Sequence, residues 1–363
     1  ISPPHHKNQI LSRLQSDDGL RDLSISRTTF QWGIPVPEGF DEQHVMYVWM
    51  DALSNYLTGV DAFGLLLEDG NLKPKLSQFW PANVHIIGKD ILWFHTVIWP
   101  CLLMSANWPL PQKVFAHGFV NDKEGKKMSK SLGNVIDPHD VLDTYPVDTF
   151  RWYLCKEAPY GGELSFSEDN VKDMHNSDFC NTIGNAVHRS TVLCGKVDFC
   201  GGFIPDVPFP SRIPDVLLNF GTVLDAYREK MEALDLQGGA RLAIQGFHDI
   251  NGYLQKEAPW KLKGDNNLIQ RQAIVRAALE AIYAATHLLL PFIPIGGKKI
   301  FQKLNTEPVT LEELGQLGPG QYLTAGTKMD AGGVLYEPFL SEEQIQKRQG
   351  RRGRNCKKKI SHG

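Results

Sequence analysis

The sequence predicts an α/β domain built on a parallel sheet, followed by an all-helical domain. From about residue 26 to 120, short apolar runs alternate with helical stretches, which is typical of strands and helices in alternation. From about residue 176 onward, apolar residues recur at three- and four-residue spacing, which predicts amphipathic helices in an antiparallel bundle. The length of 363 residues allows two or three domains, each with its own core.

Three apolar runs of the first region predict buried strands, namely His44–Met50, Asn83–Lys89 and Lys113–Val120. Between the last two lies Asp90–Ala106, which predicts a helix, with Trp99 and Pro100 near its middle. A strand, a helix and a strand in this order favour a βαβ unit with parallel strands.

Four helices are predicted in the second region, over Asp178–Leu193, Pro214–Leu234, Ala240–Lys256 and Asn267–Leu290. Residues 305–345 are rich in glycine and weakly periodic. The end of the chain, Lys347–Lys359, is strongly basic, and we expect it to be disordered.

Composition excludes several classes of protein. The net charge of -3 argues against a globally basic nucleic-acid coat protein, although a local basic face is compatible with it. The six cysteines are scattered and form no C-x-x-C pair, so we expect reduced thiols and neither a zinc knuckle nor a redox motif.

The apolar run at 281–295 is interrupted and shorter than the roughly 20 residues of a membrane span, and no secretory signal is present. Because the first residue is Ile1, we expect a fragment or a processed piece.

The sharpest motif is Gly125–Asn134, GKKMSKSLGN. Lysine ammonium groups, hydroxyls and backbone N–H groups in one flexible loop suit the oxygens of a polyphosphate. The loop supplies these groups from Lys126, Lys127, Ser129, Lys130 and Ser131. An arbitrary basic stretch is usually a solvated turn, but the string from Lys127 to Ser131 is specific enough to favour a phosphate site.

That string resembles the KMSKS signature of class I aminoacyl-tRNA synthetases, which leucyl, isoleucyl, valyl and cysteinyl enzymes also carry. Three further segments resemble the methionyl-tRNA synthetase family: Tyr47–Ala52 with Tyr56, Gly88–His95 with Trp99 and Pro100, and Glu257–Trp260. The agreement runs in order from about residue 26 to 300. The resemblance implies the second half of a Rossmann-type nucleotide-binding fold followed by a helical anticodon-binding bundle.

The resemblance also implies a methionine pocket, formed by Val48, Trp49, Ala52, Leu53, Tyr56, Ile91, Phe94, His95 and Trp99. Such a set of residues suits a methionine side chain, because aromatic rings around a thioether gain dispersion and sulfur–aromatic contacts. For any single aromatic residue of this set, ordinary core packing is an equal competitor. Leu53 departs from the pattern, since many family members have proline there.

ATP binding is implied for Gly88 and Asp90, for His117, Gly118 and Phe119 at the adenine, and for Lys127, Met128, Ser129, Lys130 and Ser131 at the phosphates. Lys127 and Lys130 take the catalytic role of stabilising the departing pyrophosphate, with Mg²⁺ as the expected metal and no zinc in this chain. Asp90 could instead be only a helix N-cap, and His117 could be a buried structural histidine.

Asn185, Arg189 and Trp260 match the family residues that contact the CAU anticodon of tRNA(Met). Splayed RNA bases stack on aromatic rings and pair with amide and guanidinium groups. Asn181, Asn185 and Arg189 form a polar stripe opposite the apolar stripe of Phe179, Ile183 and Val187, so the competing interpretation is a solvated helix face.

A second signature of the class, His-x-Gly-His, is not found in the sequence. We therefore expect the amino-terminal half of the same enzyme as a partner, together with methionine, ATP and tRNA(Met), and no membrane. The expected division is 1–25, the end of a connective insertion; 26–120, the catalytic half-domain; 121–175, the KMSKS loop and stem-contact region; 176–345, the anticodon-binding domain; and 346–363, a basic tail. Alone, the chain should bind tRNA weakly and form no adenylate.

Two other functions stay open at this point. One is a non-catalytic tRNA-binding module on the same scaffold, against which the intact KMSKS string argues. The other is a leucyl, isoleucyl or valyl synthetase, although the chain shows no sign of the large editing insertion of those enzymes. We expect a cytoplasmic enzyme, with a mitochondrial or other organellar one as the alternative, and the sequence predicts neither the oligomeric state nor the role of the tail.

Overall fold

The structure, a computed structural model, describes residues 1–16, 20–60 and 79–340. It divides into two compact units, each described by itself below. The first comprises Ile1–Val120 and Pro159–Leu164, and the second comprises Asn121–Ala158 and the chain from Ser165 onward. Within the described ranges, no helix is long and apolar enough to cross a membrane. The basic tail lies outside the described residues.

The first unit contains a parallel βαβ arrangement, as predicted. Strands β3 (His85–Gly88) and β4 (Val114–His117) pair in parallel, from His85 opposite Val114 to Gly88 opposite His117. The connection runs through the 3₁₀ helix η1 (Lys89–Ile91), the π-helix η2 (Phe94–Ile98) and α4 (Trp99–Ser105). The predicted single helix over Asp90–Ala106 is therefore wrong in detail, because a π segment interrupts it.

The predicted strand over His44–Met50 is mostly wrong. Only β2 (Val45–Met46) is a strand, which pairs antiparallel with β1 (Ser26–Arg27), and α2 (Val48–Gly59) begins two residues later. The helix buries Met50, Leu53 and Leu57, whose three- and four-residue spacing continues a helical period through the β-prone residues. Tertiary burial of that face outweighs the local strand preference.

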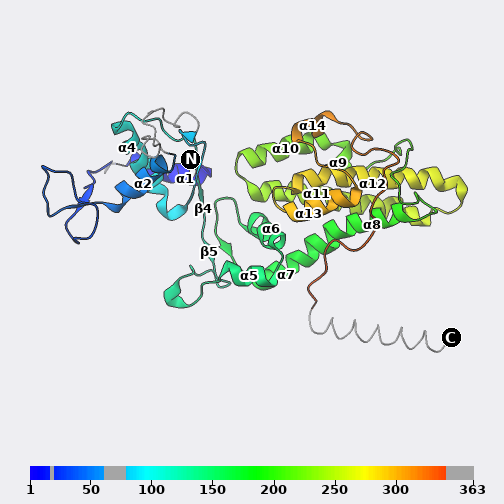
Figure 1. Cartoon of the computed structure of the whole chain (residues 1–363), viewed down its shortest axis with the longest axis horizontal. Helices are drawn as coiled ribbons and strands as arrows, with labels where there is room; N and C mark the ends of the chain where they lie inside the picture. The colour runs from blue at the N-terminus through cyan, green and yellow to red at the C-terminus, as the bar shows by residue number, and fades with distance from the viewer. Residues whose placement is uncertain (17–19, 61–78, 341–363) are drawn as a thin grey trace, which may run out of the picture. The chain divides into compact units, whose positions relative to one another are not determined.

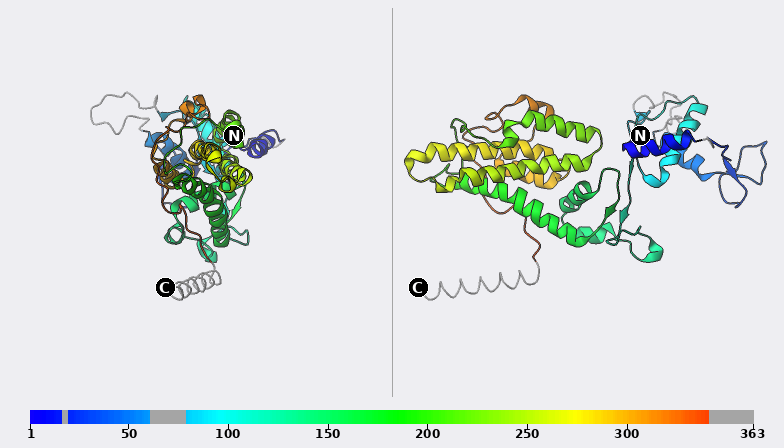
Figure 2. Two further views of the ribbon diagram at one scale, coloured as in Figure 1. Left: turned by 90° about the vertical axis from the view of Figure 1, so that its right-hand side faces the viewer. Right: turned by 180° about the vertical axis from the view of Figure 1, so that it is seen from behind.

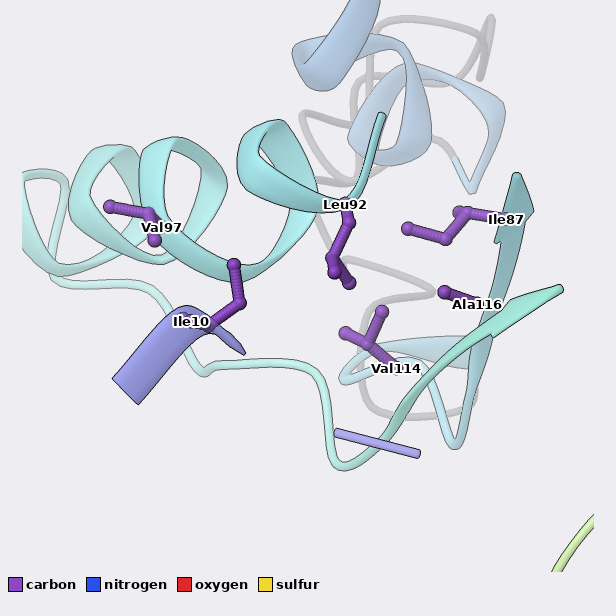
Figure 3. Packing of buried hydrophobic residues seen from close by; sticks show 6 residues of the cluster. All are labelled: Ile10, Ile87, Leu92, Val97, Val114 and Ala116. Carbon is purple, nitrogen blue, oxygen red and sulfur yellow. The ribbon is translucent and has the colours of Figure 1, made fainter. Parts of the chain in front are cut away.

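The sheet and the helices around it enclose one hydrophobic cluster (Figure 3). It joins Ile10 of α1 (Pro4–Leu14) to side chains of β3, β4 and the connection between them: Ile87, Leu92, Val97, Val114 and Ala116. The start of the chain belongs to this unit, since Ser2 N–H donates to Val114 O at 2.8 Å and Ala116 N–H donates to Ser2 O at 3.0 Å.

The second unit is helical, as predicted (Figures 1 and 2). Its elements are η3 (Lys130–Leu132), α5 (Pro138–Thr144), α6 (Val147–Glu157), α7 (Glu168–Met174), the π-helix η4 (His175–Gly184), α8 (Asn185–Gly195), α9 (Asp215–Leu218), α10 (Phe220–Glu232), α11 (Leu236–Glu257), η5 (Pro259–Lys261), η6 (Asp265–Asn267), α12 (Leu268–Leu289), α13 (Pro294–Leu304) and α14 (Leu311–Gln316). Helices α10 to α13 pack into a bundle, in which α11 and α12 lie side by side (Figure 2). Short strands β5 (Val120–Asn121) and β6 (Leu164–Ser165) pair where the chain passes between the units.

Helix α12 fixes the segment that follows the bundle. Arg276 and Glu280 form a buried ion pair at 2.7 Å, and Glu280 is completely buried. Its carboxylate also accepts from the N–H groups of Gly320, Tyr322 and Leu323, at 3.0–3.2 Å. These bonds satisfy a charge that would otherwise be costly to bury, and they hold the glycine-rich region after residue 305 against the bundle.

Candidate functional site

The residues predicted to bind methionine gather in the first unit, on α2 and on the helical run after β3. Trp49 and Phe94 stack at 3.8 Å between ring centroids, nearly parallel at 10°. Trp49 also meets the edge of His95 at 6.2 Å, and Tyr56 meets His95 at 5.6 Å and Trp99 at 6.3 Å. Five of the nine predicted residues thus form one connected group of aromatic rings.

Two hydrogen bonds define the protonation state of His95. Its Nδ1 lies 3.0 Å from the carbonyl oxygen of Ile91, which can only accept, so Nδ1 carries the proton. Its Nε2, 2.8 Å from the Tyr56 hydroxyl, is therefore the acceptor, and Tyr56 donates. Burial lowers the pKa of His95. The group is a neutral imidazole paired with a phenol, which is a polar contact without net charge.

Two residues of this group were missed by the sequence analysis. His85 of β3 lies 4.4 Å from the Tyr56 ring and 5.8 Å from His95, and burial beside His95 lowers its pKa to about 4. Trp80 lies 5.9 Å from Trp99 and donates its indole N–H to Pro109 O at 2.9 Å. The alternation of β3, which buries His85 and Ile87, is the signal that predicts an inward-facing histidine.

Part of the predicted pocket is also hydrophobic core. Leu53 and Trp99 pack with Leu57, Trp80 and Leu103 in a second buried cluster. The core-packing interpretation therefore holds for Leu53 and Trp99, which are almost completely buried. Val48 and Ala52 are exposed and follow the same face of α2 as Tyr56, at four-residue spacing, and Ile91 is half-buried.

The predicted ATP residues Gly88, Asp90 and His117–Phe119 meet at one edge of the sheet. Gly88 and His117 are opposite each other in the register, at the carboxyl ends of the two parallel strands, which is where open α/β sheets bind ligands. The N-cap interpretation of Asp90 is wrong, since Gly88 occupies that position and no side chain caps the helix. His117 is exposed, which contradicts a buried structural histidine.

Two glycines of this edge lie at close approaches, and the one at Gly118 is to backbone. A Cβ atom on Gly88 would lie 2.6 Å from the Asp90 carboxylate, and one on Gly118 would lie 2.0 Å from the backbone oxygen of Gly162. Beside them, Lys89 forms an ion pair with Glu163, and its ammonium group lies 5.1 Å from the Phe119 ring centroid. Glu163 was not predicted from the sequence.

The KMSKS loop belongs to the second unit. Lys127 and Lys130 are exposed, Met128 and Ser129 are half-buried, and the hydroxyls of Ser129 and Ser131 lie 3.2 Å apart. Its glycines turn the chain with positive φ, +78° at Gly125 and +65° at Gly133. The lysines thus face solvent on a tightly folded loop.

The predicted anticodon residues lie together in the second unit. The guanidinium of Arg189 lies 5.0 Å from the Trp260 ring centroid, and Asn185 donates from Nδ2 to Asn251 Oδ1 of α11 at 2.9 Å. Helix α11 ends at Glu257, Ala258 adopts a left-handed conformation (φ 40°), and Pro259 follows, which leaves Trp260 36% exposed. Asn185 and Arg189 are half-buried rather than solvated.

Comparison with known proteins first gives the class. The family described as "tRNA synthetases class I (M)" matches residues 2–191, more than half of the chain. The "Anticodon binding domain of methionyl tRNA ligase" matches residues 214–354. The chain belongs to the methionyl-tRNA synthetase family.

Individual relatives agree with this assignment. The chain is 36% identical to the "Methionine--tRNA ligase" of Rhizobium meliloti, covering 94% of the chain and 64% of that protein. It is 40% identical to that of Brucella suis, over 84% and 56%. The solved structure "Mycobacterium tuberculosis methionyl-tRNA synthetase in complex with methionyl-adenylate" superposes with a TM-score of 0.76 at 33% identity, over 92% of the chain and 64% of that structure. The chain thus spans less than two thirds of these relatives.

Proposed function

We propose that this chain forms the part of a methionyl-tRNA synthetase that binds methionine, holds the phosphates of ATP and contacts the anticodon of tRNA(Met). The complete enzyme joins methionine to its tRNA through a methionyl-adenylate. The observation that carries the proposal is the neutral Tyr56–His95 pair inside the aromatic group of the first unit.

This pair suits the side chain of methionine. A thioether is a weak acceptor and gains mainly from dispersion and ring contacts. Rings lie on both sides of the pair, from Trp49 to Trp99, and no ionised group is part of it. A charged pocket would favour polar amino acids instead, because methionine would displace water from the charged group without replacing the hydrogen bonds of that water, which costs free energy.

The reaction has two steps. The methionine carboxylate attacks the α-phosphorus of ATP and pyrophosphate leaves; the terminal adenosine hydroxyl of the tRNA then attacks the mixed anhydride. Lys127 and Lys130 supply positive charge for the departing pyrophosphate, and catalysis is mainly positioning and charge stabilisation. Mg²⁺ bound with the ATP phosphates would add further positive charge.

We also propose the amino-terminal half of the enzyme as a partner of the first unit. Large apolar side chains on this unit are strongly exposed, namely Trp32 (91%), Phe40 (71%), Ile86 (63%) and Val48 (61%). Ile86 points away from the core on β3, so nothing among the residues that the structure describes covers that face of the strand at this position. Exposed apolar surface of this kind is typical of an interface.

The test compares this chain alone with a completed enzyme, in which it is joined to the amino-terminal segment that carries the His-x-Gly-His motif. We expect methionine-dependent ATP–pyrophosphate exchange only from the completed enzyme. Lys130→Ala should slow the exchange while the methionine affinity stays nearly unchanged, and Lys123→Ala, on the exposed turn of the same loop, is the matched control. Exchange by this chain alone would contradict the proposal. So would a Lys130→Ala enzyme that loses exchange rate and methionine affinity to the same extent.

The choice of methionine is tested separately. Methionine should raise the melting temperature of the completed enzyme and leucine should not, since only a bound ligand stabilises the native state. If the completed enzyme binds tRNA but shows no exchange with any amino acid, the chain serves a tRNA-binding module instead.

A further inference from the structure

Two residues outside the KMSKS string, Asp122 and Asn134, are joined across the loop that contains it. Asn134 donates from Nδ2 to Asp122 Oδ2 at 2.8 Å, although the two residues are twelve positions apart. Asp122 is 7% exposed and directly follows β5, whose Asn121 is also buried. The two ends of the loop are therefore tied together at a buried point.

Asp122 organises the first half of the loop. Its Oδ1 accepts from the backbone N–H groups of Glu124 at 3.1 Å and Lys126 at 2.8 Å. Its own carbonyl accepts from Gly125 N–H at 3.0 Å. The hydrogen bond from Asn134, and then that from the Lys126 amide, lower the pKa of Asp122, which keeps the carboxylate ionised and the turn closed around it.

Asn134 organises the second half. Its Oδ1 accepts from Ser129 N–H at 2.9 Å, and its Nδ2 also reaches Lys127 O at 3.3 Å. One amide side chain thus holds the backbone on both sides of Met128. Gly133, in the left-handed conformation after η3, turns the chain back so that Asn134 can make these contacts.

We infer that Asp122 and Asn134 act as positioning residues, a clamp that fixes the backbone of residues 126–129 and thereby the origin of the Lys127 and Lys130 side chains. The inference rests on the proposed function of the loop in activation. Exposed lysines stabilise a transition state only when their approach is already ordered, because ordering them during the reaction costs entropy. The clamp supplies that order through the backbone and needs no contact with ATP.

The first experiment measures the clamp on this chain as it is, without activity. Asn134→Ala should raise the hydrogen-exchange rate of the Ser129 amide and the rate of tryptic cleavage after Lys127 at least tenfold. Lys123→Ala, on the exposed turn, should leave both rates unchanged. Equal rates in Asn134→Ala and the wild type would overturn the clamp.

The second experiment measures its use in the completed enzyme. Asn134→Ala should lower the kcat of ATP–pyrophosphate exchange about 10- to 100-fold, the loss expected from misplaced catalytic groups, with the KM for methionine unchanged. Asn134→Asp should be impaired, since it places two carboxylates against each other. Adding Asp122→Asn should recover part of that loss, because the exchanged pair can form the same hydrogen bond in the opposite direction, while the contact to Lys127 O stays lost.

The outcomes separate the clamp from the function of the loop. If Lys130→Ala impairs exchange while Asn134→Ala does not, the inference that Asp122 and Asn134 position the lysines is wrong, and the loop keeps its proposed role in activation. If neither variant impairs exchange, the proposed function fails first. If Asn134→Ala loosens the loop and kcat stays at the wild-type value, or if the exchanged pair recovers nothing, Asp122 and Asn134 are scaffolding only.

Discussion

Replacing Tyr56 by phenylalanine removes one oxygen atom from the centre of the aromatic group and keeps the ring. The Tyr56 hydroxyl is the donor to His95 Nε2, and the other ring nitrogen is already committed to Ile91 O. In the variant, Nε2 becomes an acceptor without a donor at a residue that is 2% exposed. The tautomer cannot change to compensate, because Nδ1 would then face a carbonyl oxygen without a proton.

The expected cost follows from this geometry. A buried polar atom left without its partner costs about 1–3 kcal/mol, which corresponds to roughly 5- to 150-fold in an equilibrium constant. We expect most of it in the methionine step, since the hydroxyl lies among the rings predicted to enclose the thioether. The KM for methionine should therefore rise by about one order of magnitude, while the KM for ATP stays within about twofold.

The assay is ATP–pyrophosphate exchange in the completed enzyme, with methionine varied at saturating ATP. Tyr47→Phe is the matched control, since the Tyr47 ring packs under Arg27, 3.7 Å from its guanidinium, outside the aromatic group. A Tyr56→Phe enzyme with the wild-type KM for methionine would refute the role of the pair. A loss of the same size in the control would show that any phenol on this unit matters only for folding.

Three further outcomes test other parts of the molecule. Asn251→Ala frees the Asn185 amide and should raise the KM for tRNA(Met) about 2- to 10-fold in aminoacylation, with methionine activation unchanged. Glu280→Gln leaves the Arg276 charge buried without a counter-ion and should lower the free energy of unfolding by about 3 kcal/mol in urea titrations; a loss below about 1 kcal/mol would contradict the importance of the pair. Burial lowers the pKa of His287 from 6.5 to about 4, so in an acid titration His287 becomes protonated in the unfolded chain at a higher pH than in the folded one. The contribution of neutral His287 to the free energy of unfolding is therefore complete above pH 6.5 and falls toward pH 4 by up to about 3 kcal/mol. The free energy of unfolding of His287→Phe should depend less on pH than that of the wild type, and equal slopes would refute this.

Local signals in the sequence were enough to predict the βαβ unit and the bundle. The strands β3 and β4 are short apolar runs on either side of a helix, and their parallel pairing brings Gly88 and His117 to one edge as expected. The end of α11 lies within one residue of the predicted helix end at Lys256, and Pro259 shortly after it leaves Trp260 at the surface.

The residues that hold the functional side chains in place could not be predicted from such local signals. Asn251 lies 66 residues from the Asn185 that it holds, and Glu163 lies 74 residues from Lys89. Neither residue stands in a motif, and either would pass as a solvated polar residue on its own element. Only tertiary packing shows that the amide and the carboxylate each have one specific partner.

Both π-helices lie beside side-chain contacts that orient residues predicted to bind ligands. A backbone carbonyl has two lone pairs, so it can accept from a side chain as well as from an N–H group. In η2, His95 donates to Ile91 O at 3.0 Å and Thr96 donates to Leu92 O at 2.7 Å. In η4, the carbonyl of Thr182 accepts from Asn251 Nδ2 at 2.9 Å, and the same Asn251 accepts from Asn185. In each unit, a carbonyl in or beside a π segment orients a side chain that then orients a predicted ligand contact, Tyr56 in one and Asn185 in the other. These carbonyls need not be released by the π irregularity, because His287 Nδ1 lies 2.8 Å from Tyr283 O in the regular helix α12, and Thr182 O accepts from the backbone N–H of Asn185 as well as from Asn251. The helix backbone itself is therefore the fixed acceptor on which each arrangement depends, since a carbonyl oxygen can accept a second hydrogen bond.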